Sequence, residues 1–231
     1  SVQTQRRRDV GDGASDASSA LADAYLLLAR ISQEQGRIEQ AVRELGMIDD
    51  PDMQFQIALR QAQLYASQGQ YDAALEKARQ AQARDDDERI QRIQFEAQLL
   101  REAGRLEAAI AVLEKADADL PDSTQIKYDL SMLYERVGRL DDMERLLRRI
   151  IEIDPAHAHA YNALGYTFAD RNIRLEEAHT LISRALDMMP DNPYILDSMG
   201  WVLFRQGDLG RAQDYLWQAY RIAPESEIAA H

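Results

Sequence analysis

Cysteine is absent from this 231-residue chain, so neither disulfides nor thiolate metal sites can form. No apolar run approaches the roughly 18 residues that cross a bilayer, which argues against direct insertion into a membrane. Basic residues are few as well: 27 Lys and Arg face 40 Asp and Glu, for a formal net charge of −13. Because nucleic-acid affinity depends on Lys and Arg that displace counterions, we expect no nucleic-acid partner.

Proline is scarce, with 6 residues, whereas the strong helix formers Ala, Leu, Gln, Glu and Arg dominate. The hydrophobic fraction of 45% is that of a folded protein rather than a disordered one. Residues 1–17 are polar, and we expect a linker or the edge of a preceding repeat there. The opening SVQTQRRRDV does not start with Met and precedes no apolar stretch, so we expect no signal peptide here and a piece of a longer protein.

The helical pattern that begins near Ser18 is interrupted at a regular spacing. Five segments share a glycine that is followed two residues later by an apolar residue: QEQGRIEQA, ASQGQYDAA, REAGRLEAA, ERVGRLDDM and FRQGDLGRA. Their glycines are 33, 35, 34 and 69 residues apart, and the segment DRNIRLEEA fills the long interval. Pro121, Pro155, Pro190 and Pro224 keep a spacing of 34 to 35 residues. This pattern indicates a repeat with one helix on each side of a short turn.

The period and the residue pattern resemble the tetratricopeptide repeat (TPR) family. The fifth repeat matches it with Tyr161, Leu164, Gly165, Phe168, Ala178 and Pro190. The sixth matches it with Leu196, Met199, Gly200, Leu203, Ala212, Leu216 and Pro224. The resemblance implies an all-α, right-handed superhelix of about six helix–turn–helix repeats within residues 18–224. We place these repeats at about 20–53, 54–88, 89–122, 123–156, 157–191 and 192–225, and we expect residues 225–231 to start a further helix.

The eighth place of each repeat holds a small residue, as is needed where two paired helices cross closely. These residues are Ala29, Ala62, Ala97, Ser131, Gly165 and Gly200. The turn glycines can take the left-handed conformation that ends a helix, and Asn172 stands near the place of the missing glycine in the fifth repeat. Near Asp50 and Asp85 the spacing slips by a residue, so we expect altered turns there.

The TPR family holds extended peptides or partner helices against the first helices of its repeats. In the first three repeats, the predicted inner places form a mostly polar strip: Asp23, Leu26, Arg30, Gln56, Leu59, Gln63, Gln91, Gln94, Gln98 and Arg101. In the last three they are rich in aromatics, and we expect the partner-binding residues to be Tyr128, Met132, Asn162, Tyr166, Tyr194, Asp197, Trp201, Phe204 and Arg205. We interpret Tyr161, Phe168, Leu203 and Tyr215 as core. The remaining aromatics could instead be core, or could be covered by another protein element.

Other kinds of site find little support in the sequence. The pairs on the inner face lack the Lys–Asn combination with which some TPR co-chaperones grip a C-terminal carboxylate. His157 and His159 would diverge by about 200° on a helix, so we expect no metal. The acidic run at residues 85–88 is expected to be a solvated turn and helix start. We find no nucleophile motif and no phosphate loop, and we expect neither a cofactor nor an enzyme.

A narrower resemblance rests on NALGYTFADRNIRLEEA and PDNPYILDSMGWVLFRQGDL. These segments are similar to the TPR outer-membrane lipoproteins of proteobacteria, one of which is an adaptor that brings cell-wall hydrolases to a periplasmic C-terminal processing protease. The resemblance implies such an adaptor at the periplasmic face of the outer membrane, with its lipid anchor outside this sequence. A cytosolic scaffold or assembly protein, the substrate-selecting part of a larger enzyme, and self-association stay open.

Overall fold

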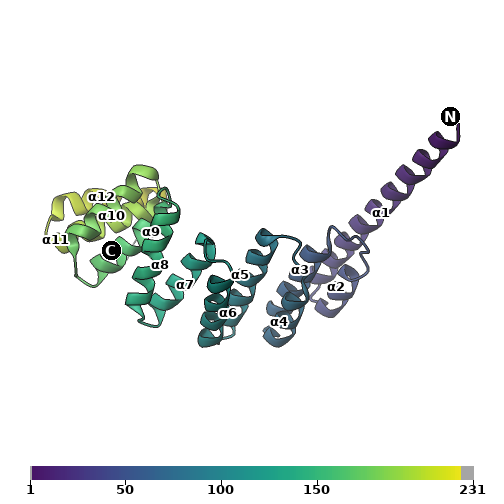
Figure 1. Cartoon of the computed structure of the whole chain (residues 1–231), viewed down its shortest axis with the longest axis horizontal. Helices are drawn as coiled ribbons and strands as arrows, with labels where there is room; N and C mark the ends of the chain where they lie inside the picture. The colour runs from purple at the N-terminus through teal and green to yellow at the C-terminus, as the bar shows by residue number, and fades with distance from the viewer. Residues whose placement is uncertain (1, 225–231) are drawn as a thin grey trace. The chain divides into compact units, whose positions relative to one another are not determined.

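The computed structural model describes the backbone of residues 2–224 and the side chains of residues 18–224. Over that range the chain forms twelve α-helices and no strand (Figure 1). They are α1 (Val2–Glu34), α2 (Ile38–Leu45), α3 (Gln54–Ala66), α4 (Tyr71–Gln80), α5 (Asp86–Glu102), α6 (Leu106–Asp119), α7 (Thr124–Arg136), α8 (Leu140–Ile153), α9 (Ala158–Asp170), α10 (Leu175–Met188), α11 (Pro193–Gln206) and α12 (Leu209–Ile222). Within the described range no helix combines the length and apolarity needed to cross a bilayer.

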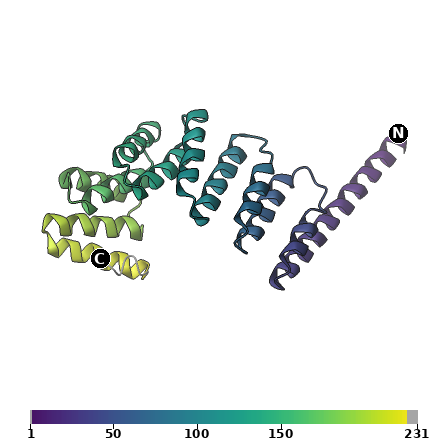
Figure 2. The ribbon, with the colours of Figure 1, turned by 90° about the horizontal axis from the view of Figure 1, so that it is seen from below.

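Within each part of the chain, successive helices pack as pairs, and neighbouring pairs stack through the following contacts. Direct packing joins α1 to α2, α3 to α4, α7 to α8, α9 to α10 and α11 to α12. Figure 2 shows the last pair side by side. Stacking between pairs uses the second helix of one and the first helix of the next, as in α2 with α3, α8 with α9 and α10 with α11. One pair cannot bury its apolar residues alone, so the neighbouring pair completes the core.

The close crossing inside each pair depends on the small residues that the sequence pattern predicts. All six are buried, from Ala29 in the first pair to Gly200 in the last. A Cβ atom at Gly165 would lie 2.7 Å from Cγ1 of Ile182 and 2.9 Å from the backbone oxygen of Ala178. At Gly200 it would lie 2.6 Å from Cγ of Leu216. These distances leave no room for a larger side chain, so the prediction of a close crossing is confirmed.

The turns also follow the sequence pattern. Gly207 ends α11 with a φ of +88°, and the N–H of Asp208 then donates to the oxygen of Leu203 at 3.0 Å. The same left-handed conformation recurs at Gly36, Gly69, Gly104 and Gly138. In the fifth repeat Asn172 takes this role with a φ of +56°, as predicted, and the longer turn adds a second left-handed residue, Arg174, with a φ of +46°.

The two altered turns have different forms. Residues 46–53 connect α2 to α3, and the side chain of Asp50 accepts the N–H of Asp52 at 2.9 Å. Asp85 is the N-cap of α5 and accepts the N–H of Glu88 at 2.8 Å. The acidic run therefore begins a helix, where negative charge is favoured by the exposed backbone N–H groups. Helix α5 consequently starts at Asp86, three residues before the predicted start of the third repeat.

The backbone at residues 2–17, where we expected a linker or a repeat's edge, has a regular structure. It is helical and continuous with α1, which Figure 1 shows as one long helix. This stretch contains no proline and several residues of high helix propensity, so nothing in it forces the helix to end. The stretch is therefore helical rather than irregular, and its role as a linker or as a preceding repeat's edge stays a prediction. The further helix expected at 225–231 lies outside the described residues.

The chain divides into two compact units, at residues 1–116 and 117–231. In the first unit a buried cluster joins the first helix pair to α3 and consists of Ala22, Ala29, Ile38, Ala41, Val42, Leu45, Ile48, Ile57 and Leu64. In the second unit the fully buried side chains come from every helix pair, and they include Ile126, Leu130, Leu147, Ile150, Leu164, Ile182, Ile195 and Leu203. Each unit is thus held by aliphatic side chains at helical spacing.

Candidate protein-binding face

Helices α7, α9 and α11 contribute one connected surface to the second unit. The hydroxyl of Thr167 in α9 donates to a carboxylate oxygen of Glu135 in α7 at 2.9 Å. Helix α11 packs directly on α9, and Arg205 donates to the oxygens of Ala169 and Asp170 at 3.1 and 2.9 Å. We call the surface formed by the nine predicted binding residues the inner face: Tyr128, Met132, Asn162, Tyr166, Tyr194, Asp197, Trp201, Phe204 and Arg205.

Aromatic side chains make the α11 part of the inner face the most accessible. Tyr194 and Phe204 are each 47% exposed. Trp201 is half-buried and stacks on Phe204, with ring centroids 5.3 Å apart and planes inclined by 22°. The guanidinium of Arg205 lies 5.5 Å from the centroid of the Trp201 ring. A rigid aromatic pair edged by a cation is suited to contact with another protein.

The α7 part of the inner face is more enclosed. Tyr128 is half-buried, and its ring lies 5.6 Å from the ring of His157. Burial raises the pKa of the Tyr128 hydroxyl, and the carboxylates of Asp129 and Glu135 raise it further. The phenol therefore stays neutral across the physiological pH range and can act as a hydrogen-bond donor there.

His157 does not lie where the sequence argument placed it. It is the N-cap of α9, and its Nδ1 accepts the N–H of Ala160 at 3.1 Å. Because His157 precedes the helix, its ring lies 6.4 Å from that of His159 instead of pointing away from it, so the predicted divergence is wrong. Among the described side chains no group of three or more His, Cys, Asp or Glu could hold a metal ion.

Three polar residues of the inner face are less available than predicted. Asp197 is only 7% exposed, because α9, α10 and α12 all pack on α11 and leave little of its surface to solvent. Arg205 donates two hydrogen bonds to carbonyl oxygens at the end of α9. These two donors are not available to a partner, and the side chain also joins α11 to α9. The side-chain oxygen of Asn162 is buried, and no described residue donates a hydrogen bond to it.

Of the four residues interpreted as core, two are buried and two are half-buried. Phe168 and Leu203 are 2% and 1% exposed, and Tyr161 and Tyr215 are half-buried. Met132 and Tyr166 on the inner face are also half-buried. The exposed part of the predicted site is therefore concentrated on α11, and partner binding by its residues stays a prediction.

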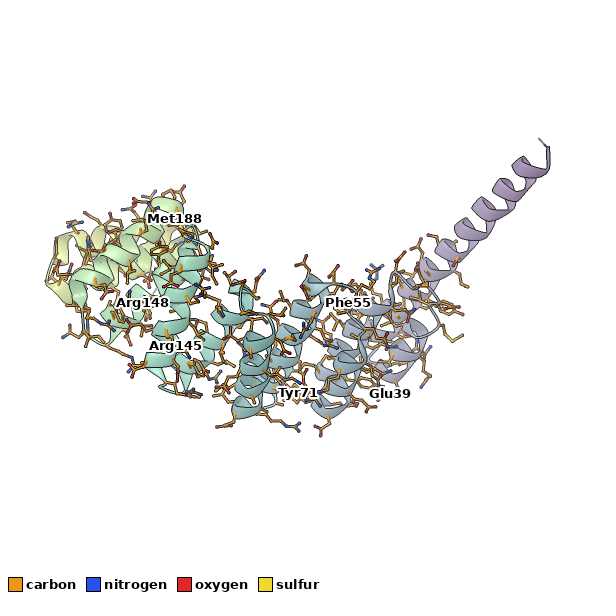
Figure 3. All side chains as sticks on the ribbon, viewed as in Figure 1. Glu39, Phe55, Tyr71, Arg145, Arg148 and Met188 are labelled. Atoms are coloured by element: carbon orange, nitrogen blue, oxygen red, sulfur yellow. The ribbon has the colours of Figure 1, made fainter. Side chains whose placement is uncertain are left out.

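An ion network between α8 and α10 was not foreseen from the sequence. Glu144 accepts two hydrogen bonds from Arg174, at 2.5 and 2.9 Å, and one from Arg148 at 2.8 Å. Arg148, labelled in Figure 3, also reaches Glu177 at 2.5 Å. Hydrogen bonds from Arg174 and then Arg148 lower the pKa of Glu144. The network ties the fourth repeat to the fifth; its pairs Glu144–Arg174 and Arg148–Glu177 join residues that are 30 and 29 apart, so no local pattern marks them.

A buried lysine in α7 was also missed. Lys127 is 4% exposed and donates to Asp117 at 2.5 Å. Lys127 stands three residues before Leu130. In the next two repeats the equivalent position holds Tyr161 and Leu196. This register is the signal that could have marked Lys127 as buried, because the equivalent residues are large and apolar. A buried ammonium needs an anionic partner, which Asp117 supplies.

Comparison with known proteins agrees with the fold. Family models described as tetratricopeptide repeat match residues 59–124 and 100–165. The TPR repeat-containing protein PA4667 of Pseudomonas aeruginosa is 36% identical over 208 residues, which cover 90% of this chain. The match covers 35% of the relative, so the chain spans about a third of that relative's length.

Two solved structures show the same architecture at low sequence identity. TTC0263, a thermophilic TPR protein of Thermus thermophilus, is 21% identical with a TM-score of 0.58, covering 76% of this chain and 95% of its own. YrrB, described as a TPR protein with an unusual peptide-binding site, is 21% identical with a TM-score of 0.51, covering 80% of this chain and 95% of its own. The predicted fold class is therefore confirmed: the chain is an all-α array of helix pairs with the architecture of TPR proteins, an architecture typical of protein-interaction scaffolds.

Proposed function

We propose that this protein is a non-catalytic scaffold that holds a partner protein against the inner face of α7, α9 and α11. The observation that carries the proposal is the set of accessible aromatic side chains on α11, where Trp201 stacks on Phe204 and Tyr194 is also exposed. Removing such rings from water on binding is favourable, and each ring loses little conformational freedom because two side-chain torsions define it. Peptide binding by YrrB, a TPR protein of similar fold, supports the same use of the array here.

We further propose that the partner is a periplasmic C-terminal processing protease, to which the scaffold presents cell-wall hydrolases. The support is the resemblance of the fifth and sixth repeats to proteobacterial outer-membrane lipoproteins, together with the 36% identity to a TPR protein of Pseudomonas aeruginosa. In this proposal the protein acts at the periplasmic face of the outer membrane, anchored by a lipid outside this sequence. A cytosolic TPR scaffold is the alternative, and it predicts no affinity for the protease.

The test is a titration of the purified chain with a C-terminal processing protease encoded in the same genome, followed by biolayer interferometry. Replacing both exposed rings, Tyr194→Ala with Phe204→Ala, should weaken binding by at least about tenfold, because truncating aromatic hot spots commonly costs about 2 kcal/mol or more. The helix content should stay unchanged, since about half of each side chain is in solvent and neither belongs to the buried core.

The matched control removes a different pair of exposed rings. Trp217 and Tyr220 on α12 are 55% and 40% exposed, with centroids 5.9 Å apart. Trp217→Ala with Tyr220→Ala should leave protease affinity unchanged. Equal loss in both double variants would refute a specific role of the inner face. A second variant, Tyr166→Ala with Trp201→Ala, probes the half-buried rings; if it lowers stability by several degrees and binds normally, these two rings are core.

A further inference from the structure

A cavity in the first unit lies outside the face just described. It occupies 370 Å³ between α1 and α3, and the end of α2 closes it. This volume falls within the roughly 300–1,000 Å³ of ordinary ligand sites. Its lining residues are Asp23, Leu26, Leu27, Ala29, Arg30, Gln33, Leu45, Arg60 and Leu64. We call it the arginine pocket.

The bottom of the arginine pocket is apolar and firmly packed. Leu45 and Leu64 are each 2% exposed, and Ala29 is 5% exposed. On the α1 side, Leu26 and Leu27 remain 38% and 50% exposed. Exposed leucines beside a cavity with buried aliphatic walls make a place where an aliphatic side chain of a partner would lose its contact with water.

The rim carries two arginines, Arg30 and Arg60, whose guanidinium groups form no ion pair with a described carboxylate. The guanidinium of Arg60 donates to the side-chain oxygen of Gln33 at 2.6 Å and to that of Gln63 at 3.1 Å, and both acceptors are uncharged. Arg30, one turn along α1 from Leu26, is exposed. Among the residues whose side chains are described, neither arginine forms an ion pair, whereas Arg79 and Arg105 of the same unit do. Asp23 is the one carboxylate in the lining.

This arrangement selects for a negative group next to an aliphatic one. A guanidinium has five N–H donors, so Arg60 keeps donors for a ligand while Gln33 and Gln63 hold it in place. Hydrogen bonds from arginine to a carboxylate are stronger than those to an amide. A carboxylate at the rim would therefore bind Arg60 more strongly than the two neutral glutamines do.

We propose that the arginine pocket is a docking site for an acidic peptide segment, in which a Leu-like side chain enters the cavity and a neighbouring Asp or Glu side chain binds Arg60 and Arg30. The segment belongs to a partner protein. None of the pocket residues belongs to the inner face, so this site is independent of the protease-binding proposal. The full array would then hold two segments of different chemistry.

The probe is a fluorescein-labelled, acetylated and C-amidated peptide with one leucine flanked by glutamates, titrated with the whole 231-residue chain and followed by fluorescence anisotropy. Replacing its glutamates by glutamines should weaken binding by about tenfold or more, because charged hydrogen bonds are lost. Replacing its leucine by serine should weaken binding as well. Added salt should weaken binding of the acidic peptide only. The amide cap removes the terminal carboxylate, so any binding comes from the side chains.

Protein variants complete the test. Arg30→Gln, at an exposed side chain, and Arg60→Gln should each lower affinity for the acidic peptide by about tenfold. Arg101→Gln, an exposed arginine on α5 outside the pocket lining, should leave it unchanged, and circular dichroism checks folding. The proposal is overturned by equal affinity for the glutamate and glutamine peptides, or by equal effects of Arg101→Gln and Arg30→Gln. Analytical sedimentation checks for self-association. If the chain self-associates and Arg60→Gln abolishes this, the pocket binds a second copy of the chain and the proposal of a partner protein is overturned.

Discussion

Replacing Gly165 by alanine tests whether the close crossing of α9 and α10 is set by residue size. The added Cβ would lie 2.7 Å from Cγ1 of Ile182 and 2.9 Å from the oxygen of Ala178, both in α10. Ile182 is fully buried, and the oxygen of Ala178 belongs to the helix backbone. Neither atom can move by itself, so α10 as a whole must shift away from α9.

Two opposing effects decide the size of the change. Overpacking a filled interface costs typically 1–3 kcal/mol, and contacts below 3.0 Å to a helix backbone place this case near about 3 kcal/mol. Alanine in place of glycine inside a helix stabilises the folded state by about 1 kcal/mol, because alanine has the higher helix propensity. We therefore expect Gly165→Ala to lower the free energy of unfolding by about 2 kcal/mol. For a chain of this length each kcal/mol lowers the midpoint temperature by roughly 2–4 °C.

Gly210 provides the matched control because it is also a helical glycine of the second unit. A Cβ at Gly210 would meet no atom within 4 Å. Gly210→Ala therefore gains helix propensity without overpacking, and should stabilise the protein by up to about 1 kcal/mol. Urea unfolding followed by circular dichroism at 222 nm measures both variants under the same conditions. The two substitutions should change stability in opposite directions.

The result that would refute this reasoning is a Gly165→Ala variant as stable as Gly210→Ala. Helix α10 would then move aside at negligible cost, and the small residues of the six repeats would not be required by close packing. A loss of stability in both variants would instead show that glycine at these places acts through backbone conformation, since only Gly165 meets other atoms.

The ion network and the buried lysine give two further predictions. Because Arg174 and then Arg148 lower the pKa of Glu144 below its ordinary 4.5, their stabilising effect is complete above pH 4.5 and is lost as the pH falls through the lowered pKa. Urea unfolding of wild type and Glu144→Gln at pH 7 and about pH 3 should show a difference that shrinks in acid; a constant difference would contradict the pairing. Asp117→Asn should destabilise the protein more than Lys127→Met does, by up to about 3 kcal/mol, because Asp117→Asn leaves the buried ammonium of Lys127 without its anion. The reverse order in thermal melts would show that Lys127 is readily solvated.

The fold was predictable because its causes repeat along the chain. A turn glycine followed by an apolar residue, a small residue at the eighth place and a proline at the repeat end all recur at about 34 residues. Asn172 was predictable for the same reason, since its place in the register called for a left-handed residue. Each signal is local, so the sequence carries it without knowledge of the packing.

The candidate sites were predicted less well, because exposure depends on every helix around a residue. Helical spacing placed Asp197 on the inner face, yet three helices pack on α11 and bury it. Spacing also assumed that His157 lies inside a helix, whereas the helix begins after it and the ring accepts a backbone N–H. Helical spacing placed Leu26 and Arg30 on the inner side of the first helix, but it did not select Arg60. Arg60 lies at the rim of the arginine pocket, where it donates a hydrogen bond to Gln33, 27 residues away, and local spacing cannot show such a contact.

By itself the sequence determined the all-helical fold, the six repeats, the turn conformations and the small residues at the helix crossings, because these depend on propensity, backbone freedom and a regular period. Tertiary structure decided which inner-face side chains stay in solvent, that Arg205 binds the end of α9, and that two arginines without described anionic partners border an apolar cavity. Those properties arise where helices from different repeats meet, and the charge and burial at such meetings depend on all the neighbours at once.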